Sequence, residues 1–75
     1  MVQQQRLTAI IEREDGGFVS LCPELDVASQ GSSIEEARTN LVEALTLFFE
    51  TADPSKFSLR YHGEVFVTQV EVPIG

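Results

Sequence analysis

The chain has 75 residues, of which 12 are acidic and 5 are basic, and its formal net charge at neutral pH is −7. This length predicts a single domain over residues 1–75, because a chain this short builds only one small core. The charge disfavours nucleic acids and anionic membranes as partners, since Lys and Arg provide most of the affinity for phosphates. A basic protein would be attracted instead, although the charge is equally consistent with a role in solubility alone.

The N-terminus gives information about location, whereas the single cysteine says little about it. Cys22 excludes a disulfide within the chain, and it lies in the apolar run Phe18–Cys22, where a buried thiol is expected. Residues 1–6 lack the apolar core of a signal peptide. No segment approaches the roughly 20 apolar residues of a membrane helix. We therefore expect a cytoplasmic protein that has no association with membranes.

The first half of the chain has the pattern of three short strands. Leu7–Arg13 is rich in β-formers and predicts the first strand. Glu14–Gly17 then supplies an Asp-Gly and a Gly-Gly pair, whose glycines provide the positive φ of a tight hairpin. Phe18–Cys22 predicts the second strand, which Pro23 ends because proline has no amide to donate. After a loop, Val27–Ser29 predicts a third strand.

A capping box indicates the start of a helix. Ser33 and Glu36 have the spacing in which the hydroxyl accepts the amide of the third helical residue and the carboxylate reaches back to the cap. Ser32 and Glu35 repeat this pattern one residue earlier, so either serine can be the cap. The helix should end before Asp53-Pro54, because proline disfavours helical geometry in the preceding residue. The predicted buried stripe of the helix consists of Ile34, Ala37, Leu41, Ala44, Leu45 and Phe48.

Two apolar groups lie outside that stripe. Val42, Leu47 and Phe49 either widen the buried face of the helix or meet another subunit. Glu64–Val72 alternates with a period of two and predicts a final strand, either an interior strand or an edge that pairs with a second copy or a partner. Leu59–His62 can add a short strand. The predicted order is β-β-β-α-β, an α+β domain with one long helix packed on a mainly antiparallel sheet.

No residue pattern points to catalysis, a cofactor or a metal. Asp15, Glu24 and Asp26 lie in predicted loops and Glu36 caps the helix, whereas a two-metal nuclease needs several carboxylates held inward on rigid elements. His62 is the only histidine, and no Ser or Cys shares a motif with it. We expect a protein that is not an enzyme, with no catalytic residue, no cofactor and no metal ligand.

The segment Glu14–Ala37 resembles the HicB family of antitoxins and their short HicB-like relatives. An acidic residue with glycines and an aromatic residue come first, followed by Cys22–Leu25, then Gly31 and the helix start Glu35–Ala37. Asn40–Leu45 and the closing strand extend the similarity over nearly the whole chain. The resemblance implies a degenerate ribonuclease-H-like β-β-β-α-β domain that lacks the catalytic carboxylates of true ribonuclease H enzymes.

The resemblance also implies a partner. HicB-like domains neutralise HicA, a small basic ribonuclease toxin, by binding it and covering its active site, which agrees with the net charge of this chain. Asp15, Glu24 and Asp26 are the predicted contacts with that partner, because they lie on loops beside the sheet. Many HicB proteins continue into a DNA-binding domain, but this sequence ends at Gly75, so we expect no direct binding of DNA or RNA.

Self-association is also expected, as a dimer or a higher homo-oligomer, because a small domain gains stability from any partner that binds only its folded form. Two other functions remain open on the sequence alone. One is an orphan oligomeric module that binds a protein other than a toxin. The other is a residual metal-dependent nuclease.

Overall fold

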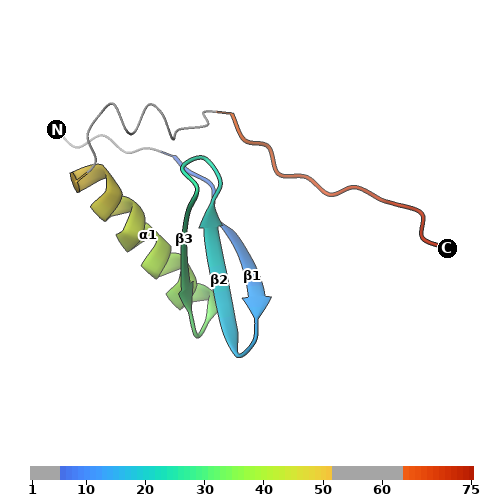
Figure 1. The fold of residues 1–75 in the computed structure, drawn as a ribbon, viewed down its shortest axis with the longest axis horizontal. Coiled ribbons are helices and arrows are strands. Elements are labelled where there is room, and N and C mark those ends of the chain that lie inside the picture. The colour runs from blue at the N-terminus through green and yellow to red at the C-terminus, as the bar shows by residue number, and fades with distance from the viewer. Residues whose placement is uncertain (1–5, 52–63) are drawn as a thin grey trace.

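The computed structural model describes residues 6–51 and 64–75. Strands β1 (Ile10–Glu14), β2 (Gly17–Cys22) and β3 (Val27–Gly31) form one antiparallel sheet in that order. Helix α1 (Ile34–Thr51) packs on one face of the sheet, mainly over β3 and β2, and leaves the β1 side less covered (Figure 1). The predicted α+β class, with one long helix on an antiparallel sheet, is confirmed.

Strand β1 begins at Ile10 and ends at Glu14, later than the predicted Leu7–Arg13. Its register explains the difference. Ile10 pairs with Leu21 near the end of β2, and Pro23 has no amide to offer to a residue further back. Strand β3 is longer than the predicted Val27–Ser29, because Gly31 still pairs with Phe18.

The glycines at the hairpin act in two different ways. Gly16 has a φ of 74°, so it provides the left-handed backbone that the turn needs. The expectation was wrong for Gly17, which does not have a positive φ. A Cβ at Gly17 would lie 2.9 Å from the carbonyl oxygen of Gly31, so this position requires glycine because β3 approaches closely.

The start of α1 follows the capping box at Ser33. The Ser33 hydroxyl accepts the amide of Glu36 at 3.0 Å, and the helix begins at Ile34. The Glu36 carboxylate accepts the amide of Ser32 at 2.7 Å and its hydroxyl at 3.2 Å. The carboxylate therefore reaches the residue before the cap. Glu35 and Glu36 also suit the positive end of the helix dipole.

Two polar side chains fix the first half of α1 on the sheet. The buried hydroxyl of Ser20 in β2 donates to the carbonyl oxygen of Ala37 at 2.8 Å. The side-chain amide nitrogen (Nδ2) of Asn40 donates to the carbonyl oxygen of Gln30 in β3 at 2.7 Å. A Cβ at Gly31 would lie 2.5 Å from the amide nitrogen of Ala37, so the helix passes directly over the end of β3.

The core is small. Its fully buried apolar side chains belong to Cys22, Leu25, Ala37 and Leu41, and partly buried Leu7, Val27, Leu45 and Phe48 pack around the core. The predicted stripe of α1 is therefore correct from Ala37 onward. It is wrong for Ile34, which is 54% exposed because it starts the helix beyond the last residue of β3.

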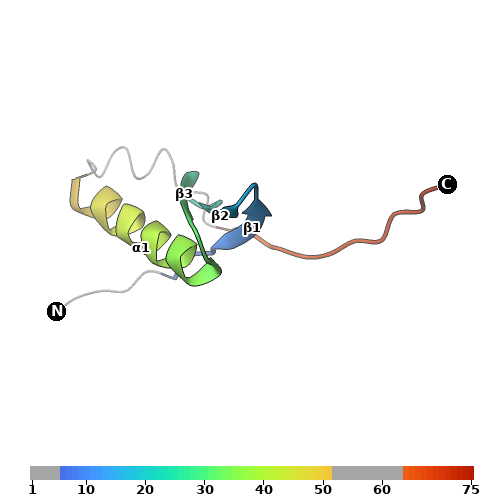
Figure 2. The same cartoon turned by 90° about the horizontal axis from the view of Figure 1, so that it is seen from below.

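The strand predicted over Glu64–Val72 is not formed. Residues 64–75 have no strand or helix, and Phe66 is 86% exposed and Val70 78% exposed. A strand needs a neighbour to accept its backbone hydrogen bonds, whereas this segment runs away from the helix and the sheet (Figures 1 and 2). The shorter strand predicted around Leu59–His62 lies outside the described residues.

Candidate partner-binding surfaces

The structure separates the three carboxylates that were predicted to contact a partner. Asp15 is exposed in the turn between β1 and β2. Asp26 is exposed in the turn between β2 and β3, with a left-handed φ of 57°. Because β2 connects these two turns, Asp15 and Asp26 lie at opposite ends of the sheet (Figure 1).

Glu24 is buried, with 7% of its surface exposed. Its carboxylate accepts the Thr8 hydroxyl at 2.6 Å and the Thr8 amide at 2.9 and 3.1 Å. The Cys22 thiol donates to the same carboxylate at 3.5 Å. Glu24 therefore holds the segment before β1 against the β2–β3 turn. Its role as a partner contact stays a prediction, which this burial does not favour.

The protonation states of Glu24 and Cys22 follow from this contact. Burial acts to raise the pKa of Glu24, but hydrogen bonds from Thr8, from the backbone and from Cys22 outweigh it and hold the pKa below the usual 4.5. Burial raises the pKa of the Cys22 thiol above its usual 9.0, and the Glu24 carboxylate adds to this effect. At neutral pH the carboxyl is ionised and the thiol keeps its proton. This arrangement favours the Sγ–H to Oε1 hydrogen bond.

An acidic hollow lies at the hairpin end of the sheet, between the β1–β2 turn and the start of α1. Its volume is about 460 Å³, and we define it by its three carboxylates, Glu14, Asp15 and Glu36. All three residues are exposed. The remaining walls come from Gly16, Gly17, Phe18, Val19, Gln30, Gly31 and Ser32. Of the three predicted contacts, only Asp15 belongs to this hollow.

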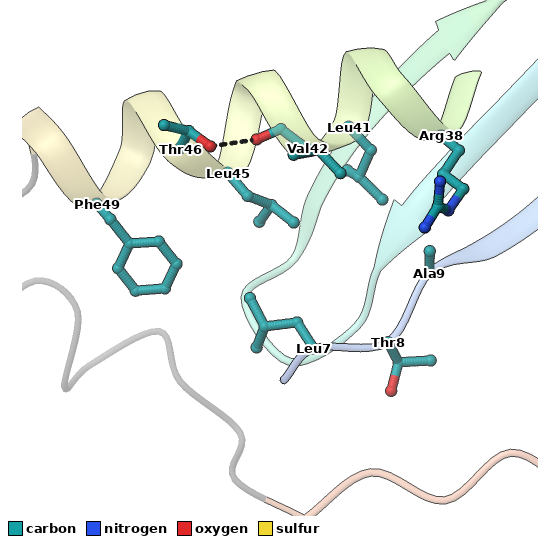
Figure 3. Close-up of a pocket in the computed structure, with 9 residues that line it drawn as sticks. All are labelled: Leu7, Thr8, Ala9, Arg38, Leu41, Val42, Leu45, Thr46 and Phe49. Carbon is teal, nitrogen blue, oxygen red and sulfur yellow. Dashed lines mark hydrogen bonds between the residues drawn. The ribbon is translucent and has the colours of Figure 1, made fainter. Parts of the chain in front are cut away.

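A second depression, the α1–β1 groove, lies between the helix and the segment that precedes β1 (Figure 3). Its volume is about 350 Å³. Its lining residues are Leu7, Thr8, Ala9, Arg38, Leu41, Val42, Leu45, Thr46 and Phe49. The Thr46 hydroxyl donates to the Val42 carbonyl within the helix at 2.8 Å, so the middle of the groove is mainly apolar. Arg38 adds a positive charge beside Ala9 (Figure 3).

The sequence left open whether Val42, Leu47 and Phe49 widen the buried face of the helix or meet another subunit. The groove answers part of this question. Val42 is 53% exposed and Phe49 42% exposed, so neither joins the buried face of α1. Both line the groove instead, opposite Leu7. Leu47 is 59% exposed and does not line it. The helix therefore presents apolar side chains that the described part of this single chain does not cover.

Within residues 6–51 and 64–75, no three His, Cys, Asp or Glu side chains gather closely enough to hold a metal ion. In the same part of the chain, no helix is both long and apolar enough to cross a bilayer. His62 lies outside these ranges.

Sequence reasoning missed the role of Glu24 and of the segment Leu7–Ala9. The sequence predicts Glu24 in a loop beside the sheet, where a carboxylate is expected to be solvated. A usable signal was present, since Glu24 lies between Cys22 and Leu25, two apolar residues that turn out to be fully buried. A carboxylate in such surroundings needs several donors, and Thr8 supplies two of them.

Together these features describe a small α+β domain with one acidic and one apolar surface.

Two curated proteins of Synechocystis sp. are similar to this chain in sequence. UPF0150 protein ssl0738 is 50% identical over 46 residues, which cover 59% of this chain and 64% of that protein. UPF0150 protein ssr1765 is 44% identical over 46 residues, which cover 59% of this chain and 58% of that protein. The matched region thus spans less than two thirds of either relative. No family model and no solved structure matches the chain.

Proposed function

We propose that this chain is an antitoxin-like protein that binds a small basic ribonuclease of the HicA type and covers its active site. The observation that carries the proposal is the acidic hollow, which Glu14, Asp15 and Glu36 line at one end of a sheet in a chain with a net charge of −7. The resemblance of Glu14–Ala37 to HicB-like antitoxins gives the class of partner. The similarity to UPF0150 proteins is compatible with that assignment and names no activity.

The mode of action follows from electrostatics and shape. Carboxylates at the hollow face the Lys and Arg side chains with which a ribonuclease holds RNA phosphates, so the two surfaces attract each other. Once they meet, the hairpin and the start of α1 occupy the space that RNA would take. In this proposal the chain supplies no catalytic group, binds no DNA or RNA itself, and acts in the cytoplasm.

The direct experiment is co-expression with a HicA-type toxin, the small basic protein that this proposal expects a neighbouring gene to encode. We expect the two proteins to co-purify, and we expect this chain to restore growth that the basic protein inhibits. Absence of both effects would refute the antitoxin function. Raising the salt concentration should weaken the complex, because salt screens exposed opposite charges, and at 0.1 M ionic strength their attraction is largely lost beyond about 10 Å.

A matched pair of double variants tests the hollow itself. Glu14→Lys with Asp15→Lys reverses two charges at the hollow, whereas Glu43→Lys with Glu50→Lys makes the same change at exposed positions on α1. Both changes alter the net charge equally. We expect the first variant to bind the basic protein at least about tenfold more weakly than the second. Equal losses would show that net charge matters and the hollow does not.

The second candidate function is an oligomeric module that binds proteins other than a toxin. It is favoured by the apolar α1–β1 groove and by the exposed apolar residues of the C-terminal segment. Co-expression separates it from the antitoxin function, because an orphan module would self-associate without restoring growth.

A further inference from the structure

The two edges of the sheet differ in how well they are covered. At the β3 edge, the side-chain amide of Asn40 donates a hydrogen bond to the carbonyl oxygen of Gln30, and α1 passes over Gly31. At the β1 edge, no hydrogen bond within residues 6–51 and 64–75 joins the outer backbone of Ile10–Glu14 to another segment. An uncovered edge offers a row of unpaired backbone groups to another strand. Strand addition is therefore expected at β1.

The C-terminal segment has the features of a strand that lacks its neighbour. Its side chains alternate between two faces, and Phe66, Thr68, Val70 and Val72 form the more apolar one. Phe66, Val70 and Val72 are 86%, 78% and 68% exposed. So large an exposed apolar fraction is costly in water, and it marks an interaction surface.

We propose that Glu64–Val72 of one copy adds as a strand to the β1 edge of a second copy, with Phe66 and Val70 covering the α1–β1 groove. The fit is chemical as well as geometric. A strand beside β1 turns alternate side chains toward the helix, where Leu7, Val42 and Phe49 already line an open apolar groove. One face of the added strand thus covers the groove, while its backbone pairs with β1.

Length and symmetry favour a second copy as the donor. A strand rises about 3.3 Å per residue, so Glu64–Val72 is long enough to run along both β1 and the preceding Leu7–Ala9. In the single chain this segment runs away from its own sheet (Figures 1 and 2). Each copy offers one donor segment and one β1 edge, so a two-fold dimer satisfies both donors and both edges at once.

Self-association of this kind responds to salt in the opposite direction from toxin binding. Each copy carries a charge of −7, so two copies repel each other and salt tightens the dimer by screening that repulsion. A complex with a basic protein weakens under the same conditions. The dimer does not depend on the existence of a toxin, so either proposal can fail while the other stands.

The experiment measures the mass of the purified full chain in solution, by sedimentation at micromolar to 100 micromolar concentrations. The variant Val70→Glu introduces a charge on the groove-facing side of the segment. Gln69→Glu introduces the same charge one residue away on the opposite side. We expect a dimer for the unmodified chain and for Gln69→Glu, and an affinity at least about 100-fold weaker for Val70→Glu. Far-UV circular dichroism should show the same helix content in all three proteins and a weaker strand signal for Val70→Glu, whose segment stays unpaired.

A mixing experiment distinguishes strand exchange from any other dimer. Val42→Glu damages the groove but keeps the segment, whereas Val70→Glu damages the segment but keeps the groove. Each variant alone should be monomeric, and an equimolar mixture should recover a heterodimer, because one intact segment meets one intact groove. A mixture that stays monomeric overturns the proposal.

Two other results would also overturn it. One is a monomeric unmodified chain at 100 micromolar. The other is a monomer in which Val70→Glu lowers the free energy of unfolding while Gln69→Glu does not, because that pattern places the segment on its own sheet.

Discussion

The two halves of α1 meet the rest of the molecule in different ways. From Ser33 to Leu41, hydrogen bonds to specific atoms hold the helix: the cap at Ser33, the Ser20 hydroxyl on Ala37, and the Asn40 amide on Gln30. From Val42 onward the hydroxyls of Thr46 and Thr51 donate to carbonyls of the helix itself, and Leu45 and Phe48 pack on the core. The first half is fixed by polar contacts and by the fully buried side chains of Ala37 and Leu41, and the second half is held by partly buried apolar side chains.

This difference separates structural residues from candidate binding residues. Directional bonds to backbone atoms are satisfied in one helix register only, so the first half of α1 has little freedom to adapt to a partner. The second half keeps exposed apolar side chains at Val42, Leu47 and Phe49. Changes in the first half should therefore alter stability, and changes in the second half should alter association. The following predictions test that division.

The largest effect on stability is expected from Gly31→Ala. The new Cβ would lie 2.5 Å from the amide nitrogen of Ala37 and 2.8 Å from the carbonyl carbon of Glu36, and both are backbone atoms that cannot rotate away. We expect a loss of about 3 kcal/mol in the free energy of unfolding, measured by urea denaturation. The control is Gly16→Ala, where no atom lies within 4 Å and only the left-handed φ costs about 1 kcal/mol. Equal losses would contradict the close approach of the helix.

A smaller loss in the free energy of unfolding is expected from Glu24→Gln. The structural change should be concentrated at the α1–β1 groove, where Thr8 lies. Removing the charge weakens the bonds to Thr8 and Cys22, so we expect a loss of about 2 kcal/mol. Hydrogen exchange of the Thr8 amide should accelerate more than exchange in the first half of α1. The matched control is Glu12→Gln, which removes an exposed carboxylate of β1 and should change stability by less than about 0.5 kcal/mol.

The same carboxylate predicts an acid dependence. The pKa of Glu24 is lower in the folded chain than its usual 4.5, so the unfolded chain binds a proton more readily. The stabilisation by Glu24 is complete above pH 4.5 and is lost as the pH falls through the lower, folded value. The difference in free energy of unfolding between the native chain and Glu24→Gln should therefore shrink in acid. A difference that stays constant down to pH 3 would be inconsistent with this linkage.

The smallest effect is expected at the start of α1. Ser33→Ala removes the acceptor for the Glu36 amide and should cost about 1 kcal/mol. Ser32→Ala removes only the hydroxyl contact with the Glu36 carboxylate and keeps the amide contact, so its cost should be below about 0.5 kcal/mol. If the two changes cost the same, Ser33 is not the cap. Thermal unfolding followed by circular dichroism is sufficient for this comparison.

The sequence predicted the elements whose causes are local. The turn at Gly16 and the cap at Ser33 depend on residues a few positions apart, and the structure confirms both. Contacts between distant residues were not predicted. The bond from Thr8 to Glu24 spans 16 positions, and the bond from Ser20 to Ala37 spans 17, so no local pattern reveals either of them.

The prediction of a strand over Glu64–Val72 failed for another reason. The alternation is a property of the segment alone, but a strand exists only when a second backbone pairs with it. The α1–β1 groove was missed for a related reason, because its walls come from residues that are far apart in the sequence, Leu7 before β1 and Val42 in the helix. The acidic hollow was found only in part, because Asp15 was singled out without Glu14.

The fixed register of α1 has a consequence for the thermodynamics of association. Ser20 and Asn40 set the rotation of the helix about its axis, and this rotation carries through the rigid backbone to Val42 and Phe49. The wall of the groove is thus in place before any strand arrives. A binding strand must order its own backbone, but it does not have to order the helix as well. More of the gain from apolar burial then remains as net affinity.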